Sequence, residues 1–172
     1  NGLDLDTYRT QKSDLSQFGV RVSAAPIIVH VGRADVPTKN REKAISIMPE
    51  LLRLRPGAVL LFVGRDGKDD AQSRTHREKW QTLIDNLGLD AQVRFAGERD
   101  DVKEIVAASS CLLMTSTHEG LPGVLLEATA AGISAVGSDI PGARYIREVA
   151  DDIELVDIVA SDKDWAMAID RA

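Results

Sequence analysis

Residues 58–97 read AVLLFVGRDGKDDAQSRTHREKWQTLIDNLGLDAQVRFAG and predict a strand, a helix and a second strand. The first apolar run, 58–63, is closed by Gly64, and the second, 92–96, is closed by Gly97. Between them, apolar residues recur at helical spacing. This stripe comprises Trp80, Leu83, Ile84 and Leu87, and it is followed by Gly88. A strand, a helix and a strand in this order indicate a right-handed crossover within a parallel sheet.

The same alternation continues through the rest of the chain. Further strands are expected at residues 26–31, 111–114, 134–137 and 153–156. Further helices are expected around residues 44–52, 102–106, 121–131, 141–149 and 161–169. The strands are nearly continuous apolar runs, which is typical of strands buried on both faces. We therefore predict an α/β fold, a doubly wound, Rossmann-like parallel sheet of about six strands.

Three local signals refine the helix boundaries. Pro49 falls inside the helical stripe of residues 44–52, so a kink or a break is expected there. Asp100 or Asp101 is the expected N-cap of the short helix around residues 102–106. Residues 161–164, Ser-Asp-Lys-Asp, form a plausible capping box for the last helix.

Length and composition exclude several classes of protein. The chain has 172 residues, which suits one domain without an internal linker. Its net charge of −6 disfavours a general nucleic-acid binder. One cysteine, Cys111, cannot form an internal disulfide or a cysteine-based zinc site. The sequence lacks an apolar stretch long enough to span a membrane and an apolar leader at its start, so a cytoplasmic location is expected.

Several nucleotide and hydrolase motifs are absent. The first predicted strand is followed by GRADVPTKN rather than G-x-G-x-x-G, which disfavours a standard NAD site. The chain also lacks a P-loop and a G-x-S-x-G elbow.

The most informative segment is residues 116–128, STHEGLPGVLLEA. Glu119 and Glu127 stand eight positions apart, and Gly120, Pro122 and Gly123 turn the chain into a helix between them. Because this helix begins at the carboxyl edge of the sheet, its free N–H groups would face a ligand crevice and suit a phosphate. Apolar neighbours on nearly all faces suggest a buried helix, in which Glu127 would need a polar partner. The alternative is a solvated helix glutamate and an ordinary turn acid.

Two cations follow the first predicted strand. Arg33 and Lys39 lie near the start of a helix, where the helix dipole disfavours positive charge unless an anion is also present. The alternative is a solvated charge pair.

The other chemistry-bearing side chains have structural interpretations. His118 is expected to form a wall of the site, His30 to be a core histidine, and His76 to lie on a solvated helix face. Cys111 is expected to be buried and inert, and Trp80 and Trp165 are expected to pack in the core or at an interface.

Together these motifs resemble the retaining GT-B glycosyltransferases of the glycogen-synthase and sucrose-synthase type, the glycosyltransferase group 1 family. The likeness rests on E-x7-E within EGLPGVLLEA, on VGR…KN, on VRFAGERDDVKEIVAASSCLLMTS and on GSDIPGAR. It extends from the NGLD at the start of the chain to about Val156. The resemblance implies that residues 1–172 are the C-terminal, donor-binding domain, and that the N-terminal acceptor domain is absent from this chain.

The resemblance also implies residue roles. Arg33 and Lys39 would hold the donor diphosphate, Glu127 the ribose hydroxyls, and Glu119, the catalytic position, would lie by the transferred sugar. On this assignment, Glu119→Gln should hardly change binding of the bare nucleotide. The remaining donor-binding positions are His118, Gly120, Leu121, Pro122, Gly123 and Val124 beside sugar and phosphate, and Gly97, Glu98 and Arg99 beside the base.

The implied enzyme needs no metal and no cofactor. Its substrate would be a nucleoside diphosphate sugar, such as a UDP- or GDP-sugar, and its partner the acceptor domain in cis. The sequence departs from the family pattern in two places: Lys39 follows Arg33 by six positions rather than five, and Tyr145 occupies a position that often holds glutamate. Two alternatives remain open, a nucleotide-sugar epimerase half of GT-B shape and a non-catalytic nucleotide-binding or interaction module. Whether the intact enzyme is peripheral at a membrane also stays open.

Overall fold

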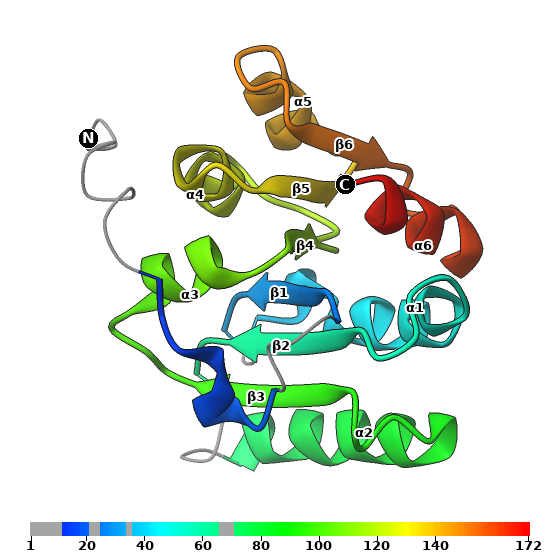
Figure 1. Cartoon of the computed structure of the whole chain (residues 1–172). Coiled ribbons are helices and arrows are strands. Elements are labelled where there is room, and N and C mark those ends of the chain that lie inside the picture. Colours follow the sequence, from blue (N-terminus) through cyan, green and yellow to red (C-terminus); the bar gives the residue numbers. More distant parts are fainter. Residues whose placement is uncertain (1–11, 21–24, 34–35, 66–70) are drawn as a thin grey trace.

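The computed structural model describes residues 12–20, 25–33, 36–65 and 71–172, and these form one six-stranded parallel sheet flanked by helices (Figure 1). The strand order is β3-β2-β1-β4-β5-β6. The strands are β1 (Ile27–Val31), β2 (Val59–Val63), β3 (Val93–Gly97), β4 (Cys111–Met114), β5 (Ser134–Ser138) and β6 (Ile153–Val156). This order is that of the Rossmann fold, which confirms the predicted fold class.

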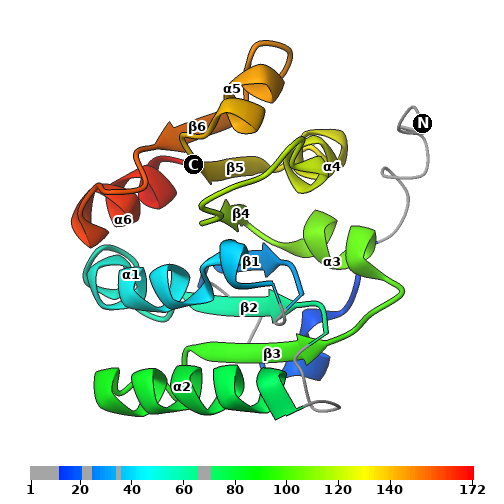
Figure 2. The same cartoon turned by 180° about the vertical axis from the view of Figure 1, so that it is seen from behind.

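Helices cover both faces of the sheet. They are α1 (Arg41–Leu54), α2 (Ala71–Leu87), α3 (Val102–Ala108), α4 (Gly123–Ala131), α5 (Pro141–Arg147) and α6 (Asp162–Arg171), with short 3-10 turns η2 (Leu15–Phe18) and η3 (Pro37–Lys39). Side chains of α1, α2 and α6 share one apolar cluster, and those of η2, α3, α4 and α5 share the other. Figures 1 and 2 accordingly show α1 and α6 on the opposite side of the sheet from α3 and α4.

The two apolar clusters form because each strand sends successive side chains to opposite faces. Leu60 and Phe62 of β2 point into the cluster under α1, whereas Leu61 and Val63 point into the cluster under α3 and α4. Both tryptophans are buried in the α1 cluster, as expected. Full burial of an aliphatic side chain, such as Leu60, Leu61 or Val63, stabilises the fold by roughly 1.5–3 kcal/mol.

Of the kink or break expected at Pro49, the break does not occur. Helix α1 continues through Pro49, which lacks the N–H that would donate to the carbonyl of Ile45. Ile45, Ile47, Met48 and Leu51 are all buried around it, and α1 packs along α6. Tertiary packing therefore offsets the roughly 3 kcal/mol that an interior proline costs a helix.

The two expected caps have different outcomes. At α6 the capping box is confirmed, with Ser161 Oγ accepting from the backbone N–H of Asp164 at 3.2 Å. At α3 the side chain of Asp101 makes no cap hydrogen bond. Its carboxylate instead accepts two hydrogen bonds from Arg99, at 2.7 and 3.0 Å, and one from Ser13 at 3.1 Å. The bidentate arginine outcompetes the cap, and it holds the pKa of Asp101 below its usual value.

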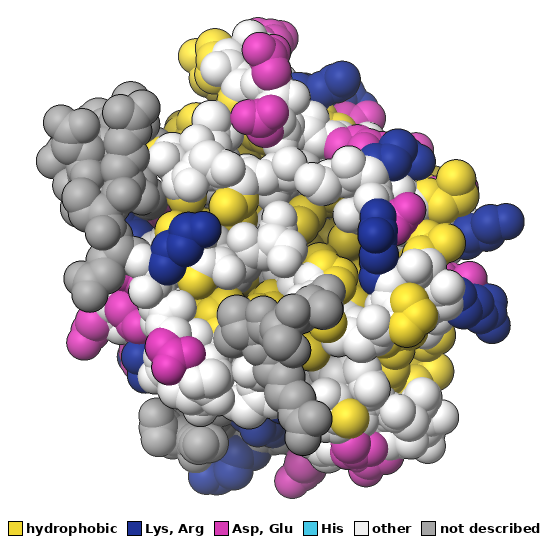
Figure 3. All heavy atoms as spheres, in the orientation of Figure 1, with side chains coloured by type: hydrophobic (Ala, Val, Ile, Leu, Met, Phe, Trp, Pro, Cys, Tyr) yellow, Lys and Arg dark blue, Asp and Glu magenta, His cyan; other side chains and the backbone are white. Residues whose placement is uncertain are grey.

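The surface carries mixed charge. On the face drawn in Figure 3, basic and acidic side chains are interspersed rather than gathered into a single basic field. Among the described helices, none is long and apolar enough to cross a membrane.

Candidate functional site

The order of the sheet reverses between β1 and β4, which lie side by side although two strands separate them in the sequence. In doubly wound sheets, ligands bind beyond the carboxyl ends of the strands at such a switch point. Two segments meet there: the described residues 32–33 and 36–40, which follow β1, and residues 115–122, which follow β4. These segments contain Arg33, Lys39 and Glu119.

The two segments are joined by hydrogen bonds between their backbones and a threonine. The N–H of Thr117 donates to the carbonyl of Thr38 at 2.8 Å. Thr115 Oγ1 lies 2.8 Å from the carbonyl of Asn40 and 3.1 Å from that of Lys39. The turn that presents Lys39 is thus held against the end of β4.

His30, on β1, also contacts this junction. Its side chain is only 1% exposed, and its Nε2 lies 3.1 Å from Thr115 Oγ1 and 3.3 Å from the carbonyl of Lys39. Since Thr115 donates its single hydroxyl proton to a carbonyl, Nε2 must be the protonated nitrogen. Burial, with a smaller effect of the nearby Arg41 cation, lowers the pKa of His30 from 6.5 to about 3. The expected core histidine is confirmed, and it is neutral.

Acidification is expected to destabilise the domain through His30. The unfolded histidine titrates near 6.5 and the folded one near 3, so the unfolded state binds the extra proton between these values. Stability is fully present above pH 6.5 and falls by about 1.4 kcal/mol per pH unit below it. Urea unfolding at pH 7.5, 6.5, 5.5 and 5.0 measures this slope.

Two variants separate His30 from other titrating groups. His30→Asn should remove most of the slope, whereas the partly exposed His76, replaced in His76→Gln, should leave it intact. Equal slopes for the wild type and His30→Asn would contradict the assignment.

Lys39 and Glu119 meet directly across the switch point. Lys39 Nζ lies 2.5 Å from Glu119 Oε1, and Ser116 Oγ donates to the same oxygen at 2.8 Å. The two charged side chains are only 22% and 18% exposed. The stem of Lys39 passes over Gly32, where any Cβ would lie 3.0 Å from its Cδ. The structure therefore brings together two of the residues that the sequence assigned to the site.

Helix α4 opens beside this pair. Its N-cap is Pro122, which provides no side-chain cap, and its first turn contains no acidic residue. The backbone N–H groups of this turn are therefore not taken by a capping side chain. The helix is less buried than expected, because only Leu125 and Ala128 are fully covered. Glu127 is half-buried, and this burial raises the pKa of its carboxyl despite the opposing Lys103.

Two further residues shape the site, and sequence reasoning missed both. Gly142, at the start of α5, packs on the backbone of the 119–120 segment: a Cβ there would lie 2.2 Å from the carbonyl oxygen of Gly120. Arg41, the first residue of α1, is 1% exposed and donates to the carbonyl of Gly32. Its guanidinium lies 5.0 Å from the ring centres of both Phe62 and Trp80. A helix that begins with arginine against its own dipole was the available signal for Arg41.

The remaining expected site residues lie at the same edge of the sheet. Arg33 is exposed after β1, and His118 and Leu121 are exposed after β4. Glu98 follows β3 and lies 3.5 Å from Arg65, while Arg99 is engaged by Asp101. Strand β3 is two positions from β1, so these two residues lie further along the same edge of the sheet.

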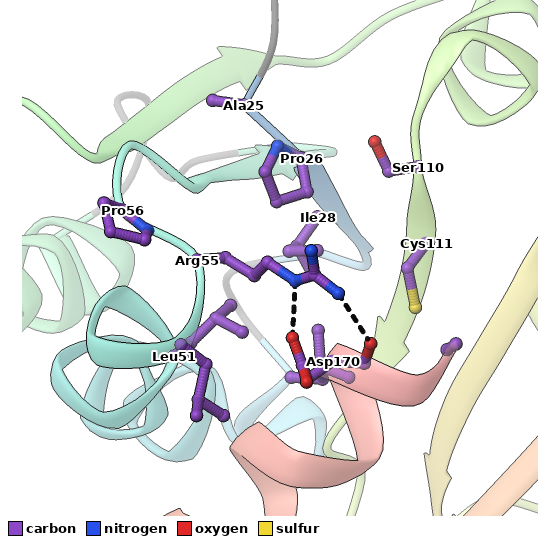
Figure 4. Close-up of a pocket in the computed structure, with 12 residues that line it drawn as sticks. Ala25, Pro26, Ile28, Leu51, Arg55, Pro56, Ser110, Cys111 and Asp170 are labelled. Atoms are coloured by element: carbon purple, nitrogen blue, oxygen red, sulfur yellow. Dashed lines mark hydrogen bonds and ion pairs between the residues drawn. The ribbon is translucent and has the colours of Figure 1, made fainter.

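A pocket of about 610 Å³ lies elsewhere (Figure 4). Pro26 and Ser110 directly precede β1 and β4, so the pocket is at the amino ends of the strands. An ion pair between Arg55 Nε and Asp170 Oδ1, at 2.5 Å, reaches across its wall (Figure 4). This is the edge at which doubly wound sheets do not bind their ligands, and the switch point remains the candidate site.

Comparisons with known proteins identify the family of this chain. The family model described as "Glycosyl transferases group 1" matches residues 12–172. The lipopolysaccharide core biosynthesis glycosyltransferase LpsE of Rhizobium meliloti is 30% identical over 134 residues, covering 78% of this chain and 36% of that protein. The lipopolysaccharide glucosyltransferase WaaG of Escherichia coli is 30% identical over 126 residues, covering 73% and 30%.

A solved structure gives the same result for the fold. Anabaena Alr3699/HepE in complex with UDP superimposes with a TM-score of 0.83 and 26% identity, covering 99% of this chain and 46% of that one. The chain thus spans about a third of the length of the curated relatives named above and less than half of this solved structure. With a family match over nearly its whole length and a Rossmann-like sheet, this chain belongs to the group 1 glycosyl transferases.

Proposed function

We propose that residues 1–172 form the donor-binding domain of a retaining, metal-independent glycosyltransferase. The intact enzyme would move a sugar from a nucleoside diphosphate sugar to an acceptor hydroxyl. The observation that carries this proposal is the Lys39–Glu119–Ser116 cluster at the switch point, beside the uncapped start of α4. A cation, a carboxylate and a helix N-terminus are the groups that a diphosphate linked to a sugar needs.

Each part of the donor has a matching group. The diphosphate takes the cations of Arg33 and Lys39 and the N–H groups at the start of α4, as anions at helix N-termini do. Glu127 accepts hydrogen bonds from the ribose hydroxyls, and Glu119 accepts from the transferred sugar. The cations and the helix replace a metal in stabilising the charge that develops on the leaving diphosphate.

Transfer then follows from this arrangement. The bond between the anomeric carbon and the phosphate oxygen breaks, the acceptor oxygen bonds to that carbon, and the acceptor proton passes to the departing diphosphate. Retention of configuration is supported by the resemblance to retaining enzymes. A uridine nucleotide is supported by Alr3699/HepE, whose structures contain UDP, and in one case UDP-glucose. A cytoplasmic location is in keeping with the single, free cysteine, Cys111, since disulfide bonds are typical of secreted proteins.

The acceptor half is expected to come from an N-terminal domain outside this chain. The relatives are roughly three times as long as the segment that matches here. Residues 1–172 should therefore bind the donor and transfer little or no sugar, since the acceptor and the closure that excludes water are missing. Robust transfer by residues 1–172 alone would contradict this division.

A thermal-shift screen with UDP, GDP, ADP and their glucose conjugates tests the proposal. A ligand at 100 times its Kd stabilises the folded state by about 2.7 kcal/mol. For a domain of this size that corresponds to a rise of about 5–10 °C in Tm. The shift should persist in EDTA. No shift with any of the six ligands would overturn the proposed function, and a shift that EDTA abolishes would overturn the metal-free part of it.

Glu127→Gln, measured in the same screen, tests whether Glu127 binds the ribose hydroxyls. Gln keeps the shape of the side chain and removes a half-buried charge, so the domain should stay folded. Loss of charge-assisted acceptance from one or two ribose hydroxyls should weaken nucleotide binding by roughly 1–3 kcal/mol. Unchanged affinity would assign Glu127 to helix stability alone.

A further inference from the structure

In the structure, the ammonium of Lys39 is neutralised by the carboxylate of Glu119. Its Nζ lies 2.5 Å from Glu119 Oε1, and both side chains are about four-fifths buried. The proposed function assigns this same ammonium to the donor diphosphate. A diphosphate must therefore take Lys39 from Glu119 or share it with that carboxylate.

Resting on the proposed function, we propose that Glu119 competes with the diphosphate for Lys39 and thereby makes the site prefer the sugar nucleotide over the spent nucleoside diphosphate. In this role Glu119 determines specificity between substrate and product, in addition to contacting the sugar.

The chemistry of the two ligands supports this preference. The terminal phosphate of a nucleoside diphosphate is a monoester whose second pKa is near 6, so it carries nearly two negative charges at neutral pH. In the sugar nucleotide the same phosphate is esterified and carries one. The bare diphosphate therefore brings more negative charge toward Glu119 while it draws away the ammonium that neutralises that carboxylate. Like charges within a few ångströms destabilise one another.

The sugar supplies the missing compensation. Its hydroxyl groups can donate to Glu119, which the bare diphosphate cannot do. Ser116 Oγ, fully buried and 2.8 Å from Glu119 Oε1, keeps the carboxylate in place while Lys39 turns toward the phosphate. After transfer the sugar is gone, Glu119 recovers Lys39, and the spent nucleotide is expelled.

The test is calorimetric titration of UDP and UDP-glucose, or of whichever pair binds in the screen, into the wild type and Glu119→Gln. Gln cannot neutralise Lys39, so the variant should bind UDP about three- to tenfold tighter, as expected for release of one partly buried ion pair. Binding of UDP-glucose should stay equal or weaken, so the preference for the sugar nucleotide falls. Acidification from pH 7.5 to 5.5 protonates the terminal phosphate of UDP. The difference in UDP affinity between the wild type and Glu119→Gln should therefore become smaller.

Asp162→Asn is a matched control. Asp162 Oδ1 also accepts from a lysine and a serine, Lys43 at 2.7 Å and Ser46 at 3.1 Å, but it lies between α1 and α6. Its removal should leave UDP affinity unchanged. Glu119→Ala, a second variant, should shift UDP affinity in the same direction as Glu119→Gln.

The outcomes separate this inference from the function on which it rests. If the wild type binds UDP-glucose but Glu119→Gln binds UDP no tighter, the inference fails and the proposed function stands. If Asp162→Asn tightens UDP binding equally, the effect is general electrostatics and the inference again fails. If the wild type binds none of the nucleotides, the proposed function fails first.

Discussion

Gly142→Ala should destabilise the domain by about 1–3 kcal/mol, the usual cost of forcing one extra carbon into packed structure. The added Cβ would lie 2.2 Å from the carbonyl oxygen of Gly120 and 3.1 Å from that of Glu119. Neither neighbour is a flexible side chain, so the backbone itself must move. The displaced segment is the one that positions Glu119 beside Lys39. The variant should therefore also lose affinity for UDP-glucose.

Gly123→Ala is the matched control for stability. It makes the same chemical change three residues beyond Gly120, but nothing lies within 4 Å of its added Cβ. Because alanine favours a helix over glycine, this variant should be as stable as the wild type or slightly more so. Urea unfolding of both variants measures the difference. Equal stability of Gly142→Ala and the wild type would show that the α5 contact does not hold the segment.

The secondary structure was largely predictable, because the strands are short apolar runs and the helices carry regular apolar stripes. Pro49 shows a limit of prediction from local sequence patterns. Local propensity predicts a kink or a break at the proline, whereas packing of α1 against α6, which sequence patterns do not reveal, keeps the helix unbroken. Asp101 fails as a predicted cap for a related reason, since Arg99 is a stronger partner for its carboxylate.

The sequence predicts a set of candidate site residues, but it does not predict the contacts between them. Lys39 and Glu119 are 80 positions apart, and they meet only because β1 and β4 are neighbours in the sheet. The hydrophobic periodicity of the strands does not determine which strands are neighbours in the sheet. Sequence reasoning thus gave Lys39 to the diphosphate and Glu119 to the sugar, and it expected bare nucleotide binding to be indifferent to Glu119→Gln. The ion pair changes that expectation.

The strand order also distinguishes two identical tripeptides. Val-Gly-Arg occurs at residues 31–33 and again at 63–65. The two glycines are packed together, since a Cβ on Gly64, whose φ is +121°, would lie 2.5 Å from the carbonyl oxygen of Gly32. Strand β1 borders β4, whose following loop carries Glu119, whereas β2 is one strand removed. Only Arg33 therefore follows a strand at the switch point, and Arg65 lies instead beside Glu98.

Arg33→Ala should accordingly weaken binding of UDP and UDP-glucose by about 10- to 150-fold. A charge-assisted hydrogen bond is worth roughly 1.5–3 kcal/mol, and each 1.4 kcal/mol is tenfold in Kd. Both ligands contain the diphosphate, so both should lose affinity by a similar factor. Added salt should weaken wild-type binding more than binding by the variant, since part of the attraction is screened.

Two arginine variants test whether position or charge is responsible for this loss. Arg53→Ala removes the same charge from the exposed end of α1, beside Glu50, and should leave nucleotide affinity unchanged. Arg65→Ala removes an arginine from the identical tripeptide on β2 and should cost far less than Arg33→Ala. Calorimetry with UDP on all three variants decides the question. Equal losses in Arg33→Ala and Arg65→Ala would move the diphosphate away from the β1–β4 switch point, and equal losses in all three would reduce Arg33 to a contribution to net charge.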